Sequence, residues 1–433
     1  MKKTNQPSAF GYRSGKLYAD QVELSSLALR LGTPLYVYSA SSFEAGLKAL
    51  QKGLAPLGRS TVCYALKSNS NVAIVRMMGE LGAGADIVSG GELERARLAG
   101  IDGKNIVFSG VGKTADEISA GIHYGTNGIT SFHVESVPEL LLIDEVARSV
   151  KKGPARVALR FNPNIDAKTH PYISTGLKRN KFGLNAAEVR EAVSLLPSLK
   201  GVTLAGMSIH IGSQLTSLSP LKAAFAALGR EILAVESTLG RQLDFADLGG
   251  GVGIQYKKES PPSIDSYCKE VVKAFGPKSQ FGSRLRILLE PGRVISGNSG
   301  VLVSKVLFRK KRPGKDFLII DAGMNDLMRP ALYGSYHGLV PLEQARTRSK
   351  SKKTDLVGPV CESGDCFASD RPVPVSLQAG DLVACLSAGA YGMSLSRNDN
   401  SRPRPAEVLV TGSQWRVIRD RERFEDLIRG EHA

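Results

Sequence analysis

The chain has 433 residues, and its 57 lysines and arginines against 41 aspartates and glutamates give a net charge of +16. Hydrophobic residues make up 42% and charged residues 23%, which is typical of a globular protein and excludes a disordered or fibrous one. At roughly 150 residues per domain, the length predicts two or three domains, or a large barrel with a smaller partner. No stretch approaches about 18 consecutive apolar residues, so we expect no membrane-spanning helix.

Two features of the sequence, its first residues and its cysteines, predict a cytoplasmic protein. The chain begins Met-Lys-Lys but has no apolar segment after it, so we expect no secretory signal. The five cysteines are odd in number and mostly scattered, which is typical of reduced thiols in the cytosol; they are Cys63, Cys268, Cys361, Cys366 and Cys385.

Two basic runs raise the question of a nucleic-acid partner. Arg309–Arg312 lies between two β-rich stretches and before Pro313-Gly314, so we expect a solvated hairpin tip. Arg348–Lys353 lies in a polar stretch that predicts a mobile surface loop. Neither run is interleaved with aromatic residues that could stack on bases. We therefore expect surface charge, with no nucleic-acid or membrane partner, and keep nucleic-acid binding as the weaker alternative.

Eight β-rich runs alternate with helix-length amphipathic stretches over about 230 residues, which predicts a (β/α)8 barrel. An open doubly wound sheet would carry the same alternation. The runs are TVCYAL (61–66), ADIVS (85–89), NIVFS (105–109), GITSF (128–132), RVALRF (156–161), TLAGMSIH (203–210), LDFADL (243–248) and LRILLE (285–290).

After Pro291 the pattern changes to short β-rich runs separated by turn residues, with no long helix before the last residues. The N-terminal segment adds one further β-rich run, PLYVYSA (34–40). The sequence therefore predicts a barrel over residues 40–290 and an all-β second domain after it, while the first forty residues could pack on either domain.

Chemically useful residues follow four of the predicted barrel strands, at the face where barrel enzymes place their active sites. Lys67 follows the first run, His210 ends the sixth, Gly249–Gly253 (GGGVG) follows the seventh, and Glu290 ends the eighth. A lysine that can form an imine and a glycine-rich phosphate cradle are what pyridoxal phosphate requires. Each feature alone has a plainer reading as a surface lysine, a core histidine or a tight turn, and Ile254 breaks the dinucleotide-binding spacing.

Six motifs, in this order, resemble the fold-type III pyridoxal-phosphate-dependent decarboxylases: YALKSN, IHIGSQ, DLGGGVG, EPGR, CESGD and AGAYG. The likeness runs from about Gly11 to Arg416. It implies an N-terminal (β/α)8 barrel over residues 40–290 and a β-barrel or β-sandwich domain formed by residues 1–39 and 291–433. It also implies pyridoxal 5'-phosphate as cofactor and a homodimer in which the β domain completes the active site across the dimer.

The resemblance also implies roles for single residues. Lys67 would join the cofactor as an imine, His210 would stack on its ring, and Glu290 would pair with the pyridine nitrogen. A carboxylate at that nitrogen favours the charged ring that decarboxylation needs, whereas the related alanine racemases have an arginine there. The remaining cofactor residues would be Ser213, Gly250, Gly251, Gly292 and Tyr391 at the phosphate, with Arg293 beside them, and Arg160 near the phenolic oxygen. Asp86 either orients the site or only ties down its loop.

A substrate with two carboxylates needs a cation for the distal carboxylate and an acceptor for the distal ammonium. The residues that the resemblance assigns to this task are Arg293, Arg329, Tyr333, Glu362 and Tyr391. Cys361 would return a proton to the α-carbon after CO2 leaves, and in the family it comes with Glu362 from the partner subunit. The implied reaction converts meso-2,6-diaminopimelate to L-lysine and CO2, the last step of lysine biosynthesis.

Alternatives remain open. A C-x4-C metal pair or a disulfide would use Cys361 and Cys366, but no further cysteine or histidine lies nearby in the sequence, so we expect no metal. A relative acting on ornithine, arginine, carboxynorspermidine or a carrier-bound aminoacyl group is the rival enzyme. A non-catalytic basic binding protein is the rival from another class, although intact Lys67, Glu290 and Cys361 argue against it.

Two positions depart from the family pattern. The usual Asn-Val-Glu-Ser run after the fourth strand begins with His133, and a tyrosine near the C-terminus is replaced by Asp399. Losing the tyrosine at Asp399 could change the rim of the pocket or the dimer interface, but it does not touch the lysine, the carboxylate at the ring nitrogen or the cysteine.

Overall fold

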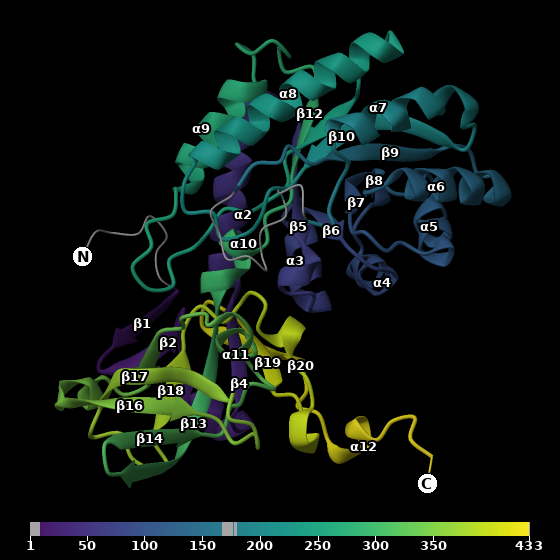
Figure 1. Ribbon diagram of the computed structural model, residues 1–433. Helices are drawn as coiled ribbons and strands as arrows, with labels where there is room; N and C mark the ends of the chain where they lie inside the picture. Colours follow the sequence, from purple (N-terminus) through teal and green to yellow (C-terminus); the bar gives the residue numbers. More distant parts are fainter. Residues whose placement is uncertain (1–8, 167–175, 177–179, 433) are drawn as a thin grey trace. The chain divides into compact units, whose positions relative to one another are not determined.

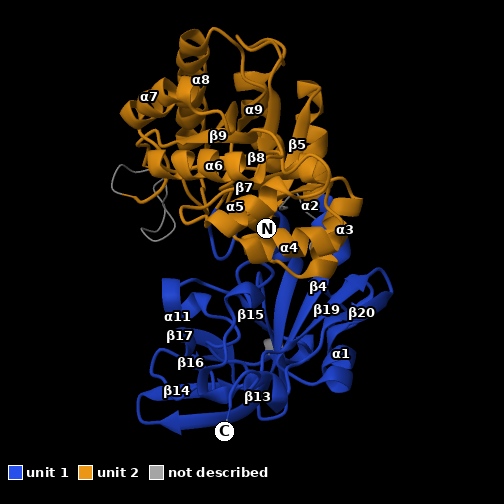
Figure 2. Cartoon of the chain, turned by 90° about the vertical axis from the view of Figure 1, so that its right-hand side faces the viewer, with its two compact units in different colours: residues 1–45, 255–259, 295–433 blue, residues 46–254, 260–294 orange. Residues whose placement is uncertain are grey.

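A computed structural model describes residues 9–166, 176 and 180–432, in which the chain forms two compact units (Figures 1 and 2). The barrel unit comprises Gly46–Ile254 and Ser260–Val294. The β unit comprises the residues up to Ala45, the short excursion Gln255–Glu259, and Ile295 onward. Each unit is described by itself.

Eight parallel strands close into a barrel, which confirms the predicted (β/α)8 architecture. Their order around the barrel follows the chain, and β12 pairs with β5 to close it. The strands are β5 (Ser60–Ala65), β6 (Gly84–Ile87), β7 (Ile106–Phe108), β8 (Ser131–Val134), β9 (Ala155–Phe161), β10 (Val202–Ile209), β11 (Phe245–Asp247) and β12 (Arg286–Leu289).

Helices alternate with these strands and surround them in Figure 1. They are α2 (Ala40–Leu54), α3 (Val72–Glu80), α4 (Gly90–Ala99), α5 (Ala115–Ile122), α6 (Val137–Val150), α7 (Ala186–Leu195), α8 (Ser219–Leu239) and α9 (Ile264–Phe275). Their starts carry the expected caps: the Ser89, Thr114, Ser136 and Asn185 side chains each accept a hydrogen bond from a first-turn N–H.

The barrel interior is filled by apolar side chains, so it is a packed core. One cluster of buried residues from the strands contains Cys63, Val107, Ala158, Ala205, Phe245 and Leu288. Phe245, from β11, is the largest of them. The polar residues of the barrel are consequently found where the strands end.

The fourth barrel strand differs from its prediction. GITSF (128–132) was expected to be the strand, but β8 runs from Ser131 to Val134. Gly128 has φ +72°, a left-handed turn conformation that stops a strand from starting there. His133 therefore lies within β8, and its side chain is buried.

The β unit is built on a nine-stranded sheet in which β4 (Leu35–Ser39) lies between β13 (Gly300–Arg312) and β19 (Ala406–Thr411). Its strands run in the order β17 (Cys366–Pro374), β16 (Ser351–Val357), β14 (Lys315–Ile320), β13, β4, β19 and β20 (Gln414–Arg419), with β15 (Leu339–Pro341) paired to β18 (Leu382–Cys385) and β18 to β13. A small sheet of β1 (Phe10–Arg13), β2 (Lys16–Ala19) and β3 (Val22–Glu23) and the helices α1 (Leu24–Leu31), α10 (Arg293–Ser296), α11 (Arg329–Tyr333) and α12 (Phe424–Leu427) complete the described elements.

The two basic runs lie in this unit. Arg309–Arg312 ends β13, and the chain turns at Pro313-Gly314 into β14, as predicted for a hairpin. The loop predicted for Arg348–Lys353 is wrong in part, because β16 begins at Ser351 and pairs with β14 and β17. Lys352 has a salt bridge to the buried Asp316 that supports this strand start.

Among the described residues, no helix combines the length and the apolar character that crossing a membrane requires.

Candidate active site

Lys67 lies in a short 3-10 turn directly after β5, as the strand-end argument predicts. Its Nζ forms a salt bridge of 2.9 Å with Oδ2 of Asp86, a fully buried carboxylate on the neighbouring strand β6. Burial, with the charge of Glu290 adding to it, raises the pKa of Asp86 to about 6, while Lys67 opposes the shift. Asp86 is expected either to orient the site or only to tie down its loop. In the structure its carboxylate contacts Lys67 directly.

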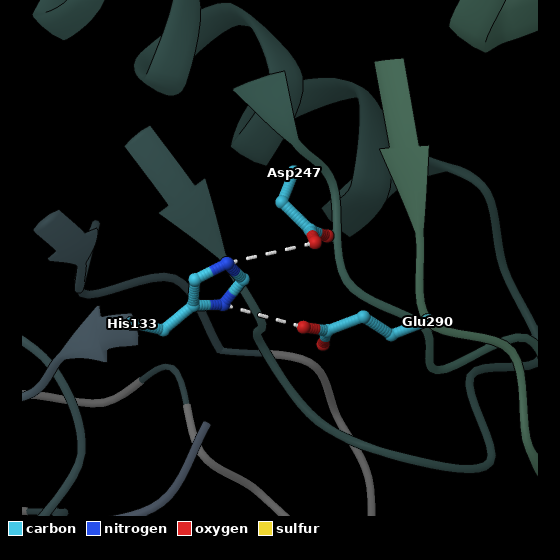
Figure 3. Close-up of side chains that lie close together, drawn as sticks. All are labelled: His133, Asp247 and Glu290. Atoms are coloured by element: carbon cyan, nitrogen blue, oxygen red, sulfur yellow. Dashed lines mark ion pairs between the residues drawn. The ribbon is translucent and has the colours of Figure 1, made fainter. Parts of the chain in front are cut away.

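A buried row of three residues, Asp247–His133–Glu290, lies at the ends of β11, β8 and β12 (Figure 3). His133 Nδ1 is 3.4 Å from Glu290 Oε1, and His133 Nε2 is 3.8 Å from Asp247 Oδ2. Ser109, at the end of β7, donates to Glu290 over 3.2 Å and lies 3.2 Å from His133 Nδ1. We call these three residues the Asp247–His133–Glu290 row.

The two carboxylates of this row have opposite pKa shifts. Burial, together with the charge of Glu290, raises the pKa of Asp247 well above its ordinary value. Burial alone would also raise the pKa of Glu290, but the hydrogen bond and charge of His133, with Lys67, lower it below its ordinary value. Glu290 is therefore the ionised carboxylate of the row.

Histidine and two carboxylates are also ligand types for a divalent metal, and their ligand atoms lie within 4.8 Å of one another. The two carboxylates, however, face different nitrogens of the same ring, as Figure 3 shows. One ion could bind only one of these nitrogens. The geometry favours a histidine placed between two carboxylates over a metal centre.

The loops after β10, β11 and β12 pack closely because glycine lines them. Gly249 and Gly251 have φ +64° and +110°. A Cβ on Gly250 would lie 2.2 Å from the Glu290 carbonyl oxygen, and one on Gly251 would lie 2.4 Å from the Gly212 oxygen. The motifs IHIGSQ, DLGGGVG and EPGR thus meet at one end of the barrel, and side chains there would force the loops apart.

His210 follows β10 and contacts the glycine loop, which we define as Gly249–Gly253, the segment that follows β11. Its Nδ1 accepts a hydrogen bond of 3.2 Å from the Gly250 N–H. The ring is closely surrounded although part of its surface stays accessible, and this desolvation, with the charges of Arg160 and Lys67, lowers its pKa to about 3. His210 is therefore neutral near pH 7, with its ring proton on Nε2.

Two arginines reach the same end of the barrel. Arg293 is buried, and its Nε and Nη2 donate to Ser213 Oγ over 3.3 and 3.2 Å. Arg160, on β9, forms a buried salt bridge of 2.5 Å with Glu135. Gly292 precedes Arg293, and a Cβ there would meet Ser68 Cβ at 3.0 Å.

The other predicted residues lie in the β unit. Arg329 begins α11 and is buried, its guanidinium 4.6 Å from the Tyr256 ring centroid and its Nη1 2.9 Å from His337 Nε2. Tyr333 ends α11 and is half-buried, as is Tyr391, which has φ +54°.

Cys361 and Glu362 lie on an exposed loop of the β unit. The Cys361 N–H donates to Asn400 Oδ1 over 2.8 Å, and the nearby Asp365 accepts from the N–H groups of Val360 and Met324. These hydrogen bonds fix the loop backbone and leave the side chains exposed. Cys361 and Cys366 are both free thiols.

Several site residues escaped the sequence argument. Ser109, His133 and Asp247 stand at the ends of β7, β8 and β11, so the strand-end rule, applied to every strand, would have found Ser109 and Asp247. His133 was missed as a contact because its strand was placed too early. Tyr256 and His337, which contact Arg329, carry no sequence signal, because they come from distant parts of the chain.

Comparison with known proteins gives a consistent result. A family model described as pyridoxal-dependent decarboxylase, pyridoxal binding domain, matches residues 40–297. The chain is 44% identical to the diaminopimelate decarboxylase of Neisseria meningitidis serogroup B, over 96% of this chain and 97% of that one.

Solved structures agree. The crystal structure of diaminopimelate decarboxylase from M. jannaschii superimposes with a TM-score of 0.90 at 35% identity, covering 98% of both chains. That of the Helicobacter pylori diaminopimelate decarboxylase, complexed with L-lysine, superimposes with a TM-score of 0.86 at 40% identity, covering 94% of this chain and 98% of that one.

Proposed function

The chain belongs to the pyridoxal-dependent decarboxylases, and we propose that it converts meso-2,6-diaminopimelate to L-lysine and CO2, the last step of lysine biosynthesis. The observation that carries this proposal is the full-length likeness to diaminopimelate decarboxylases, in a chain whose barrel brings together the lysine, histidine, carboxylate and glycine motifs.

The buried groups of the barrel fit pyridoxal phosphate. Ten buried side-chain atoms have no hydrogen-bond partner among the described residues, and four of the ten lie on barrel strands: Asp86 Oδ1, His133 Nε2, Ser208 Oγ and Asp247 Oδ2. Buried polar atoms are ordinarily paired, so their gathering indicates a site for a polar ligand. When bound, pyridoxal phosphate supplies a ring that accepts the electron pair left behind as CO2 departs.

Lys67 is the residue proposed to hold the cofactor. An amine must lose its proton to act as a nucleophile, and Asp86 Oδ2 lies 2.9 Å from Nζ, where it can accept that proton. The pKa of Asp86, raised to about 6 chiefly by burial, suits a group that takes up and returns a proton near neutral pH.

Glu290 and His210 would contact the cofactor ring. Glu290 is ionised and can hold a proton on the ring nitrogen, which increases the electron-accepting power of the ring. His210 is neutral, so its flat ring can lie against the cofactor without placing a second positive charge there. Arg160 would lie near the phenolic oxygen.

The phosphate would be held by donors that surround the glycine loop. Arg293 and Ser213 already contact each other, and Gly250, Gly251 and Gly292 keep the backbone open. Tyr391 of the β unit would add its hydroxyl group.

Substrate recognition is assigned to both units. Arg293 and Arg329 would bind carboxylates, Tyr333 and Tyr391 would add hydroxyl donors, and Glu362 would accept from the distal ammonium. Arg329 is already oriented by Tyr256, His337 and Ser335. Cys361 would deliver a proton to the α-carbon from its exposed loop.

We also infer a cytoplasmic homodimer with shared active sites. The five free cysteines support a reducing compartment. The exposed side chains of Cys361 and Glu362 support the shared active sites, because they stay accessible to another copy of the chain.

A substrate panel tests the activity. Purified protein supplied with pyridoxal phosphate should release CO2 from meso-diaminopimelate faster than from ornithine, arginine or carboxynorspermidine. Lys67→Ala should abolish this release, while the exposed Lys200→Ala should keep it. Faster release from any other member of the panel would refute the proposed substrate.

A further inference from the structure

His133 is held on every side at the end of β8. Its side chain is 1% exposed, and its ring stacks on Phe245 with a centroid distance of 6.4 Å and an interplanar angle of 25°. Its carbonyl oxygen accepts from Lys113 Nζ over 2.8 Å, and Lys113 is itself buried against Glu139. Both backbone and ring are thus fixed, so the ring nitrogens have a defined direction.

The hydrogen bonds around Glu290 depend on the proton of His133 Nδ1. Ser109 has one hydroxyl proton, and it donates that proton to Glu290 Oε1. Ser109 Oγ can then only accept from His133, so Nδ1 must carry a proton that it shares between Ser109 and Glu290. Glu290 therefore receives hydrogen bonds on one oxygen, and the carboxylate is oriented by them.

The other ring nitrogen of His133, Nε2, also faces a carboxylate. Nε2 points toward Asp247 Oδ2 (Figure 3). The other oxygen of Asp247, Oδ1, accepts a hydrogen bond of 2.8 Å from the Gly249 N–H. Asp247 thus links the row to the glycine loop. Through His133, the position of Glu290 is connected to the loop that follows β11.

We propose that His133 is a positioning residue that holds Glu290 in place as an ionised carboxylate directed at the cofactor's ring nitrogen. This rests on the proposed cofactor site and deepens it. The position is one of the two at which the sequence departs from the motif pattern that the resemblance implies, which has an asparagine there. Asparagine can supply a donor near the place of Nδ1 but cannot reach Asp247.

Other charges face the same site and must be considered with it. They are Lys67 and Cys63 from β5 and its end, Asp86 from β6, Arg160 from β9, His210 after β10, Asp247 from β11 and Glu290 after β12. Burial favours the neutral form of Glu290, and His133 is the first group that opposes it. Without His133, the carboxylate should take up a proton at higher pH, as Asp247 does.

The experiment measures the affinity of the full-length protein for pyridoxal phosphate, followed by the visible absorbance of the bound cofactor, from about pH 8 to pH 6. His133→Leu removes both ring nitrogens, and His133→Phe keeps a flat ring against Phe245 in case the leucine variant does not fold. His133→Asn keeps one donor. His123→Asn is the matched control, because His123 is exposed at the end of α5.

We expect the leucine and phenylalanine variants to bind the cofactor about ten- to hundredfold more weakly at pH 8, since a buried carboxylate that loses a hydrogen-bond donor costs about that much. Their affinity should fall further than that of the wild type as the pH is lowered, because a protonated Glu290 offers no negative charge to the protonated ring nitrogen. The asparagine variant should stay within about threefold of the wild type at pH 8. His123→Asn should match the wild type throughout.

Wild-type affinity and pH dependence in both apolar variants would overturn the proposal, because they would show that Glu290 needs no support from His133. A parallel loss at all pH values that asparagine does not rescue would also overturn it, since packing alone would explain it. Failure of the proposed substrate looks different: the wild type would bind the cofactor but release no CO2 from diaminopimelate. Failure of the wild type to bind the cofactor would refute both.

Discussion

Buried carboxylates in this protein differ in charge because their nearest partners differ. Glu290 has His133 and Lys67 close by and is ionised. Asp326, in the β unit, accepts from the Gly323 N–H and from Asn325 Nδ2, but burial is the largest influence on it and raises its pKa to about 7. A neutral neighbour satisfies a hydrogen bond without compensating a charge, so this carboxyl group resists ionisation.

The pKa of Asp326 predicts how stability changes with pH. In the folded chain it lies above the ordinary value of 3.8, so the folded state holds one more proton between those values. The stability from this group is fully present below about pH 4 and is lost as the pH rises through about 7. Asp326→Asn, which resembles the protonated form, should therefore gain stability relative to the wild type over this range, by about 2–4 kcal/mol in total.

Chemical denaturation at several pH values measures this difference. The exposed Asp116→Asn, at the start of α5, provides the control and should show no such trend. Parallel stability curves for the wild type and Asp326→Asn would contradict the assignment of a raised pKa to this carboxyl group.

The residues at the carboxyl ends of the barrel strands could be predicted from the sequence better than the residues at which the strands begin. Lys67, His210, Glu290 and the glycine loop lie at the carboxyl ends of their strands, as the alternating pattern implied. The start of β8 could not be predicted from this pattern, because the chain turns at Gly128, the first residue of the β-rich run.

The β unit was harder to predict. β17 contains Pro372 and Pro374, residues that usually argue against a strand, but it lies at the edge of the sheet, where a missing N–H is tolerated. The excursion Gln255–Glu259 belongs to the β unit although barrel residues flank it in the chain. No local pattern could reveal this, since it depends on contacts between distant segments, such as Tyr256 with Arg329.

Strand β10 contains a tight position that can be tested. Its register with β9 shifts between Leu204 and Gly206, and a Cβ on Gly206 would lie 2.7 Å from ring atoms of Phe245. Gly206→Ala should therefore overpack the barrel core and destabilise the protein by about 1–3 kcal/mol. Urea denaturation measures the change.

Gly112→Ala is the matched control, because nothing lies within 4 Å of a Cβ there. Equal stability of both variants would mean that Phe245 moves aside freely, against the close packing described for the barrel. Because Phe245 stacks on His133, Gly206→Ala should also weaken cofactor binding.

At the scale of the whole molecule, the proposed site explains only a small part of the excess of positive charge. Lys67, Arg293 and Arg329 are assigned to an anionic cofactor and a dicarboxylate substrate, but they are far too few to explain a net charge of +16. We interpret the rest of the excess as solvated surface charge, which can attract anionic ligands. They give no reason to infer a nucleic-acid partner.

The proposed sharing of active sites in a homodimer predicts complementation between two inactive variants. Lys67→Ala and Cys361→Ala, each inactive alone, should regain activity when mixed subunits form, because one site of each mixed dimer has an intact lysine and an intact cysteine. Random pairing predicts about a quarter of the wild-type sites. CO2 release from the co-expressed variants measures this, and a mixture as inactive as its components would contradict sharing.

The central claim is that Lys67 at the end of β5 holds pyridoxal phosphate for the reaction. Reduction of the cofactor-loaded protein with borohydride fixes the cofactor to the lysine that carries it, and peptide mass spectrometry then identifies that residue. We predict a phosphopyridoxyl group on Lys67 in the wild type and none on any lysine of Lys67→Ala. Labelling of a different lysine, or no labelling of the wild type, would contradict the account.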